Sequence, residues 1–105
     1  MSDTNAAIKD LIEKNRVVVF MKGTPDQPQC GFSQRVAMIV KALGVPFASV
    51  DVIGQPEFRD AIKTYSNWPT IPQLYIDGAF VGGSDIAYEM YQSGELQKMI
   101  DTKPA

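Results

Sequence analysis

The sequence predicts an α/β fold in which one four-stranded mixed sheet carries helices on both faces. The β-branched run Val17–Met21 indicates a buried strand. An amphipathic segment and a second apolar run, Phe47–Asp51, follow it, which predicts a right-handed parallel βαβ unit. The pair Asp77-Gly78 between two short apolar runs predicts a β-hairpin. We expect one domain over residues 1–105, because this length supports a single modest core.

The first half of the chain contains two expected helices. Thr4 or Asn5 can cap the first, which ends near Asn15 and has an apolar face formed by Ala7, Ile8, Leu11 and Ile12. A loop rich in Gly and Pro covers Lys22–Gln29, and the second helix starts at about Gly31. Gly44 is its expected C′ residue, and its expected apolar stripe is Phe32, Val36, Val40 and Leu43.

The second half predicts three helices around the hairpin. Pro56 starts the third helix, with Phe58, Ile62 and Tyr65 on one face. The stiff loop Asn67–Pro72 precedes hairpin strands at 73–76 and 79–81. Ser84 or Asp85 then caps a helix carrying Ile86, Met90 and Tyr91, and after Gly94 a last helix holds Leu96 and Ile100. Residues 103–105 are expected to be a free end. This order of elements is the thioredoxin-like arrangement.

Composition excludes several classes of protein. Ten basic and twelve acidic side chains give a net charge of −2, which argues against nucleic-acid binding. No apolar run approaches the roughly 20 residues of a membrane helix, so we expect no membrane association. The N-terminus has no signal or transit pattern, and one cysteine fits a reducing compartment. A cytoplasmic protein is the expectation.

The single cysteine, Cys30, is the candidate reactive group. The chain has no histidine, which excludes a Cys/His couple and a His-ligated metal. Cys30 stands at a helix entry, where free amides and the helix dipole favour a thiolate. Ser33 lies one turn further along the helix, and Lys22 can add positive charge. The alternative is a buried cysteine that packs as a small apolar residue.

Three further features suggest a binding site, and each has a simpler alternative. In Trp68–Pro72, a cis bond between Ile71 and Pro72 would leave the Ile71 backbone free to pair with an extended ligand, in front of an expected edge strand. The alternative is a rigid turn. The run Gly82-Gly83-Ser84-Asp85 can bring helix amides to a ligand carboxylate, or can simply cap the helix. Arg59 and Lys63 form a cationic pair. The alternative is a solvated face, which is also expected for Arg35 and Lys41.

Together these motifs resemble those of the monothiol glutaredoxins of the Cys-Gly-Phe-Ser type. The resemblance covers the chain up to Ile100 and rests on four motifs in the family order: Met21–Pro25, Cys30–Ser33, Trp68–Pro72 and Gly82–Asp85. It implies a glutathione site. Lys22, supported by Arg59 and Lys63, would bind the glycine carboxylate. Ile71, beside a cis Pro72, would pair with the cysteinyl part, and Gly83, Ser84 and Asp85 would hold the γ-glutamyl end.

The resemblance also implies a [2Fe–2S] cluster. Four thiolates usually hold such a cluster, and two copies of Cys30 with two glutathiones supply four in a homodimer. Cys30 would then be both the catalytic residue and the metal ligand. Iron–sulfur acceptor apoproteins and a BolA-type protein are the implied partners. Many members have cysteine where this chain has Ser84, so a disulfide between that position and Cys30 cannot form here.

Three functions remain open. The first is cluster binding and transfer, and the second is reduction of protein–glutathione mixed disulfides. The third, which the resemblance implies, is a regulatory module that shares its cluster with a BolA-type partner and can coexist with the first. The loop Thr24–Gln29 is longer than in the dithiol glutaredoxins and lies beside the thiol, where it can misplace an attacking glutathione. This favours the cluster carrier over the enzyme.

Overall fold

The computed structural model describes residues 3–102, and their helices and strands follow in the predicted order. The elements are α1 Asp3–Lys14, β1 Val17–Met21, α2 Gly31–Ala42, β2 Ala48–Asp51, α3 Glu57–Ser66, β3 Gln73–Ile76, β4 Ala79–Gly82, α4 Ser84–Ser93 and α5 Glu95–Asp101. The expected free end at 103–105 lies outside the described residues. No helix among residues 3–102 combines the length and the apolar character that crossing a membrane requires.

The sheet has the predicted mixed topology, with the strand order β2-β1-β3-β4. β1 pairs with β2 in parallel, and β3 pairs with both β1 and β4 in antiparallel fashion. The expectation that Pro72 precedes an edge strand is wrong, because β3 is an inner strand. The ladder between β1 and β3 begins at Gln73, one residue after Pro72, so the missing N–H of the proline costs no sheet hydrogen bond.

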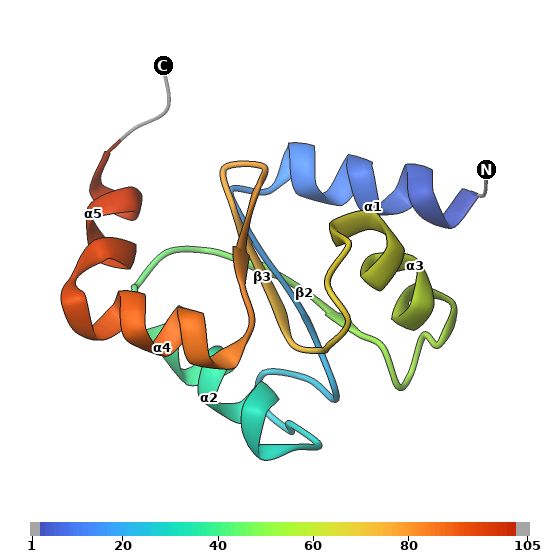
Figure 1. The fold of residues 1–105 in the computed structure, drawn as a ribbon, viewed down its shortest axis with the longest axis horizontal. Helices are drawn as coiled ribbons and strands as arrows, with labels where there is room; N and C mark the ends of the chain where they lie inside the picture. The colour runs from blue at the N-terminus through green and yellow to red at the C-terminus, as the bar shows by residue number, and fades with distance from the viewer. Residues whose placement is uncertain (1–2, 103–105) are drawn as a thin grey trace.

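Helices cover both faces of the sheet (Figure 1). α1 and α3 pack on one face, where Ile8, Ile12, Phe58 and Ile62 form a core with side chains of all four strands, β4 contributing the partly buried Phe80. α2, α4 and α5 pack on the other face around Val36, Val40, Ala87 and Leu96. Every residue of β1 is buried because β1 is an inner strand covered on both faces. This explains its unbroken apolar run.

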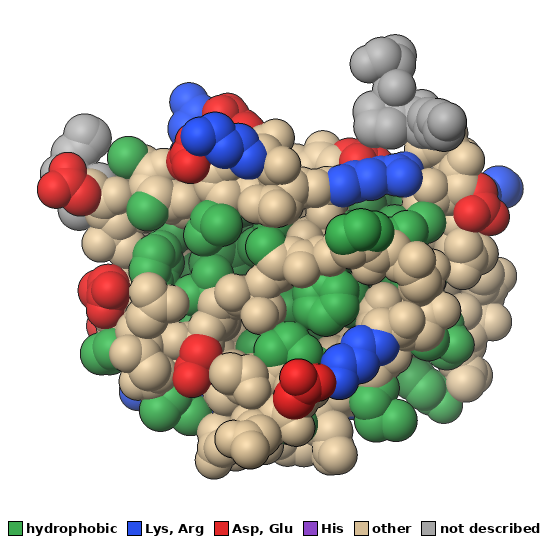
Figure 2. Space-filling view, turned by 180° about the vertical axis from the view of Figure 1, so that it is seen from behind, with side chains coloured by type: hydrophobic (Ala, Val, Ile, Leu, Met, Phe, Trp, Pro, Cys, Tyr) green, Lys and Arg blue, Asp and Glu red, His purple; other side chains and the backbone are tan. Residues whose placement is uncertain are grey.

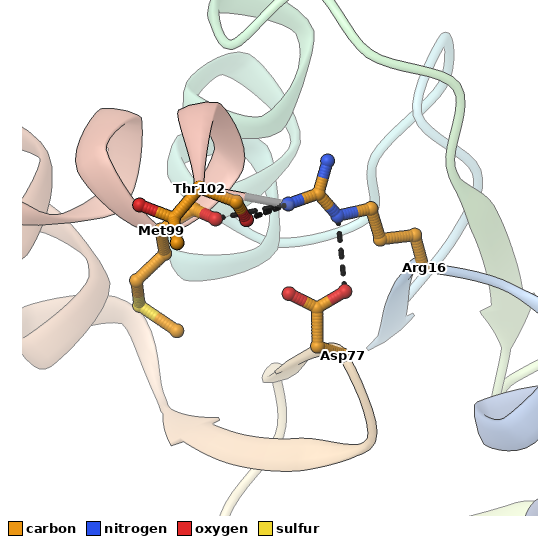
Figure 3. A network of polar contacts seen from close by, with 4 residues as sticks. All are labelled: Arg16, Asp77, Met99 and Thr102. Carbon is orange, nitrogen blue, oxygen red and sulfur yellow. Dashed lines mark hydrogen bonds and ion pairs between the residues drawn. The ribbon is translucent and has the colours of Figure 1, made fainter. Parts of the chain in front are cut away.

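Hydrogen bonds join the hairpin turn to the start of β1 and, through Arg16, to the end of α5. Asp77 and Gly78 have φ values of 52° and 82°, as a two-residue type I′ turn requires. The Arg16 guanidinium donates to Asp77 Oδ1 over 2.9 Å and to the carbonyl oxygens of Met99 and Thr102 over 2.9 and 2.8 Å (Figure 3). One side chain therefore links the start of β1, the hairpin and the end of α5.

Several predicted core positions are at the surface. Phe32 is 63% exposed, and Tyr65, Ile86 and Tyr91 are also exposed. On α2 the buried residues are Ser33, Val36, Ala37, Ile39 and Val40, and helix geometry places Phe32 between Val36 and Ile39. Phe32 is exposed because it stands in the first turn of the helix, beyond the buried run. Figure 2 shows that hydrophobic side chains gather across the middle of one face of the molecule, with most charged side chains nearer its rim.

Candidate functional site

Cys30 is the N-cap residue of α2, as its place in the sequence predicts. It has extended backbone angles, and its Sγ accepts a hydrogen bond from the Ser33 backbone N–H over 3.4 Å. The side chain is partly exposed, which differs from the alternative of a fully buried apolar cysteine. The helix N-terminus therefore acts directly on the sulfur.

Ser33 links Cys30 to the end of β1. Its side chain is fully buried, and its Oγ accepts from the Lys22 backbone N–H over 3.0 Å and lies 3.4 Å from the Cys30 Sγ. Because the Lys22 N–H occupies an acceptor site of the hydroxyl, the hydroxyl proton is free to point at a thiolate.

The surroundings of Cys30 favour its thiolate. Burial acts to raise the pKa of the thiol, but other effects outweigh it. Hydrogen bonds from the Ser33 side chain and from the backbone of Ser33 and Phe32, together with the Lys22 charge, lower the pKa of the thiol below its usual value. Both sequence-predicted neighbours, Ser33 and Lys22, thus act on the sulfur.

The loop before Cys30 is held at its start by Asp51 and in its middle by Lys41. The Asp51 carboxylate accepts from the backbone N–H groups of Gly23 and Ile53, both over 2.9 Å. Burial acts to raise the pKa of Asp51, but the backbone hydrogen bonds outweigh it and lower the pKa. Lys41 reaches from α2 to the Pro25 carbonyl and the Asp26 carboxylate, so the expectation of a merely solvated Lys41 is wrong.

A cavity of about 480 Å³ opens beside the thiol. All eight residues that the resemblance assigns to glutathione line it, namely Lys22, Arg59, Lys63, Ile71, Pro72, Gly83, Ser84 and Asp85. They come from the residue after β1, from α3, from the loop before β3 and from the start of α4, segments far apart in the sequence. Cys30 is not among the lining residues, whereas Lys22 and Phe32 on either side of it are.

The cavity is rich in unpaired positive charge. Within residues 3–102, Lys22, Arg59 and Lys63 have no carboxylate within ion-pair distance. At the α4 side, no side chain caps the helix, so its first N–H groups remain without an intrahelical acceptor. The N-cap residue is Gly83, and the expectation that Ser84 or Asp85 caps this helix is wrong. Such a cavity suits a ligand with carboxylates at both ends.

The wall between these ends offers backbone and indole groups. The Ile71–Pro72 bond is cis, as anticipated. In the part of the chain that the structure describes, the backbone of Ile71 has no hydrogen-bond partner. The Trp68 Nε1 is buried without a partner, and a Cβ placed on Gly83 would lie 3.5 Å from it. Sequence reasoning missed this indole, because only the long-range packing of the loop against α4 shows that its donor is unused.

Arg35 belongs to the site region, and the expectation of a solvated cation is wrong. Its Nε donates to Ser84 Oγ over 2.9 Å, and its Nη2 donates to Asp85 Oδ1 over 2.6 Å. The guanidinium carbon also lies 4.7 Å from the centre of the Tyr88 ring. These contacts join α2 to α4 across about 50 residues of sequence, so no local pattern could reveal them.

No resident metal centre is evident in the described range, where no three His, Cys, Asp or Glu side chains lie close enough together to hold a metal ion. A single thiolate cannot hold an iron–sulfur cluster alone. Any cluster chemistry therefore needs thiolates from outside this chain.

Comparison with known proteins decides the family. The glutaredoxin family profile matches residues 17–81, the segment from β1 to β4 that includes the thiol and most of the cavity. The chain belongs to the monothiol glutaredoxins. It is 57% identical over 99 residues to an uncharacterized monothiol glutaredoxin of Synechocystis, a match that covers 94% of this chain and 92% of that protein.

Two further relatives agree. A probable monothiol glutaredoxin 2 of Rickettsia prowazekii is 53% identical over 93 residues, which is 89% of this chain and 87% of that protein. The solution structure of a reduced apo glutaredoxin from poplar is 51% identical, with a TM-score of 0.80 and coverage of 91% of this chain and 88% of that chain. This monothiol glutaredoxin thus has the thioredoxin-like fold that its sequence predicts.

Proposed function

We propose that this monothiol glutaredoxin binds glutathione in the cavity beside Cys30 and uses it to hold and transfer a [2Fe–2S] cluster. One observation supports the proposal most strongly. Three cations without ion-pair partners line a cavity next to a thiol whose pKa is lowered. A small anionic thiol is the ligand that satisfies both features.

Glutathione matches the cavity group by group. Its glycine carboxylate would pair with Lys22, Arg59 and Lys63. Its cysteinyl backbone would pair with the unpartnered backbone of Ile71, and its γ-glutamyl carboxylate would meet the free amides at the start of α4. This arrangement brings its thiol toward Cys30.

The cluster is cargo, and its ligands come from four molecules. A [2Fe–2S] centre usually takes four thiolates, and this chain supplies one. In a homodimer, two Cys30 thiolates and two glutathione thiolates complete the set. Two of these four ligands are exchangeable, which suits donation to iron–sulfur acceptor apoproteins. A BolA-type protein in place of the second copy is the alternative partner.

A second candidate function is reduction of glutathione mixed disulfides, and the lowered thiol pKa favours it as well. The Cys30 thiolate would attack the glutathione sulfur of the mixed disulfide and expel the thiolate of the substrate protein. A second glutathione thiolate would then attack the Cys30–glutathione disulfide, releasing oxidised glutathione and regenerating the Cys30 thiolate.

Reconstitution tests the proposal. The protein is loaded anaerobically with ferrous iron, sulfide and glutathione, and then assayed for its visible spectrum, iron, sulfide, glutathione and sedimentation. We expect a dimer with one [2Fe–2S] centre and two glutathiones that passes its cluster to an apo-ferredoxin. The Cys30→Ser variant, and wild type without glutathione, serve as controls and should stay colourless. A cluster-loaded monomer, or full loading of Cys30→Ser, contradicts the proposal.

A further inference from the structure

The Arg35 guanidinium contacts three side chains in the first two turns of α4. Its Nε binds Ser84 Oγ, its Nη2 binds Asp85 Oδ1 over 2.6 Å, and its guanidinium lies over the Tyr88 ring. Ser84 and Asp85 line the cavity, whereas Arg35 is not among its lining residues. Arg35 therefore influences a bound ligand through these two side chains and through its charge.

We propose that Arg35 is a positioning residue that makes the α4 end of the cavity select a ligand carboxylate and leaves a ligand ammonium group dispensable. This inference rests on the proposed function for its ligand. It predicts that thiols whose α-amino group is acylated or missing bind nearly as well as glutathione, provided that both carboxylates remain.

The charge balance at this end supports the inference. Asp85 is the carboxylate among the residues that line the cavity, and in the described structure it is the group able to attract an ammonium. Arg35 occupies its Oδ1 and brings the pair close to neutral. The unpaired amides of α4 and the partial positive charge of its N-terminus then dominate, and both favour an anion.

We expect the contacts of Arg35 to contribute little to the free energy of unfolding. Asp85 is 84% exposed, so water screens the ion pair with Arg35 and limits what the pair adds to folding. The Tyr88 ring and the Ser84 hydroxyl hold the planar fork in one orientation, which an ammonium group at this position cannot reproduce. The principal consequence of the contacts is therefore the electrostatics of the cavity.

Three thiol-blocked probes test the proposal without redox chemistry: S-methylglutathione, its N-acetyl derivative, and the analogue that lacks the γ-glutamyl α-carboxylate. Dissociation constants come from NMR titration of the full chain. For wild type, N-acetylation should weaken binding less than about two-fold and loss of the carboxylate about five-fold, the upper range of an exposed charge pair. In Arg35→Gln the order should reverse, with N-acetylation costing about five-fold.

Two variants separate this effect from general charge and from folding. Lys98→Gln removes one exposed cation of α5 far along the chain and should keep both wild-type ratios. Arg35→Lys keeps the charge and should restore the wild-type ratios in part. If N-acetylation of S-methylglutathione changes the dissociation constant by the same factor in wild type and Arg35→Gln, the proposal is overturned while the proposed function stands. Failure of wild type to bind S-methylglutathione overturns both.

Discussion

Replacing Ser33 by alanine tests how this fold activates its thiol. In the wild type the Ser33 Oγ accepts from the Lys22 N–H over 3.0 Å and lies 3.4 Å from the Cys30 Sγ. Ser33→Ala removes the hydroxyl and leaves the Ser33 backbone N–H, the Phe32 backbone N–H and the Lys22 charge still acting on the sulfur. The thiol pKa should therefore rise but stay below that of a free cysteine with no such partners.

The magnitude follows from one hydrogen bond to a charged acceptor. Such bonds contribute about 1.5–3 kcal/mol, and the long contact to a partly exposed sulfur places this one at or below the lower end. Since about 1.4 kcal/mol corresponds to one pKa unit, we expect a rise of about one unit. The Lys22 N–H also loses its acceptor, which should lower the free energy of unfolding by about 1–2 kcal/mol.

The assay is the pH dependence of alkylation by iodoacetamide, with the free energy of unfolding measured in urea. Below its pKa, the variant should react about ten-fold more slowly at a given pH. Ser49→Ala is the control, because Ser49 is an exposed serine on β2 away from the thiol. An unchanged alkylation profile in Ser33→Ala, or an equal shift in Ser49→Ala, would refute the reasoning.

The free energies of unfolding of wild type and Ser33→Ala should also diverge at alkaline pH. A thiol whose pKa is lower in the folded than in the unfolded chain adds stability as pH rises through the folded pKa, and the addition is complete above the unfolded value of about 8.5. Because Ser33→Ala narrows the gap between the two pKa values, its alkaline gain in stability should be smaller. Urea titrations at neutral and alkaline pH measure this difference.

Three further outcomes are expected. Asp51→Asn should destabilise the protein at neutral pH. The pKa of Asp51 is lower in the folded than in the unfolded chain, so its carboxylate stabilises the fold fully above the unfolded pKa and loses this effect as pH falls through the folded pKa. The loss of stability in Asp51→Asn should therefore shrink below about pH 4. Equal losses in urea at neutral pH and below about pH 4 would contradict this. Arg16→Met should lower the free energy of unfolding by about 1–2 kcal/mol in urea, since it removes a partly exposed ion pair and two hydrogen bonds to carbonyl oxygens, and an unchanged midpoint would count against that role. Arg59→Gln should weaken S-methylglutathione binding by up to about five-fold in NMR titrations, against Lys98→Gln as control, and equal affinities would exclude Arg59 from the site.

The strands and the thiol setting could be predicted because their signals are local. β1 and β3 have the predicted bounds, since a continuous apolar run and a hairpin turn each mark a strand within a few residues. The contact between Cys30 and Ser33 follows from helix geometry, which places residues three apart on one face. The family resemblance added the residues of the cavity, and the structure brings all of them together.

What the sequence could not predict depends on packing between distant elements. Phe32 is apolar and shares the packed face of α2 with Val36 and Ile39, yet it stands in the first turn and lines the cavity, which leaves it exposed. Arg35 has the same composition as any surface cation, and only the approach of α4 gives it Ser84 and Asp85 as partners. A hydrophobic stripe predicts which face of a helix packs, but how far the core extends along that face depends on what lies against it.

Thiol activation and ligand binding use different parts of the chain, and Lys22 is where they meet. Ser33 acts on the sulfur from α2 and does not line the cavity. Arg59 lines the cavity from α3 and is not among the groups that lower the pKa of Cys30. The backbone of Lys22 holds the Ser33 hydroxyl, its charge lowers the Cys30 pKa, and its side chain lines the cavity. Loss of the Ser33 hydroxyl should therefore change the thiol pKa without changing the contacts to the ligand, and loss of the Arg59 charge should change ligand binding without changing the thiol pKa. The Lys22 charge couples the two, so that an anion bound against it cancels part of its effect on the sulfur and raises the thiol pKa toward that of the free side chain.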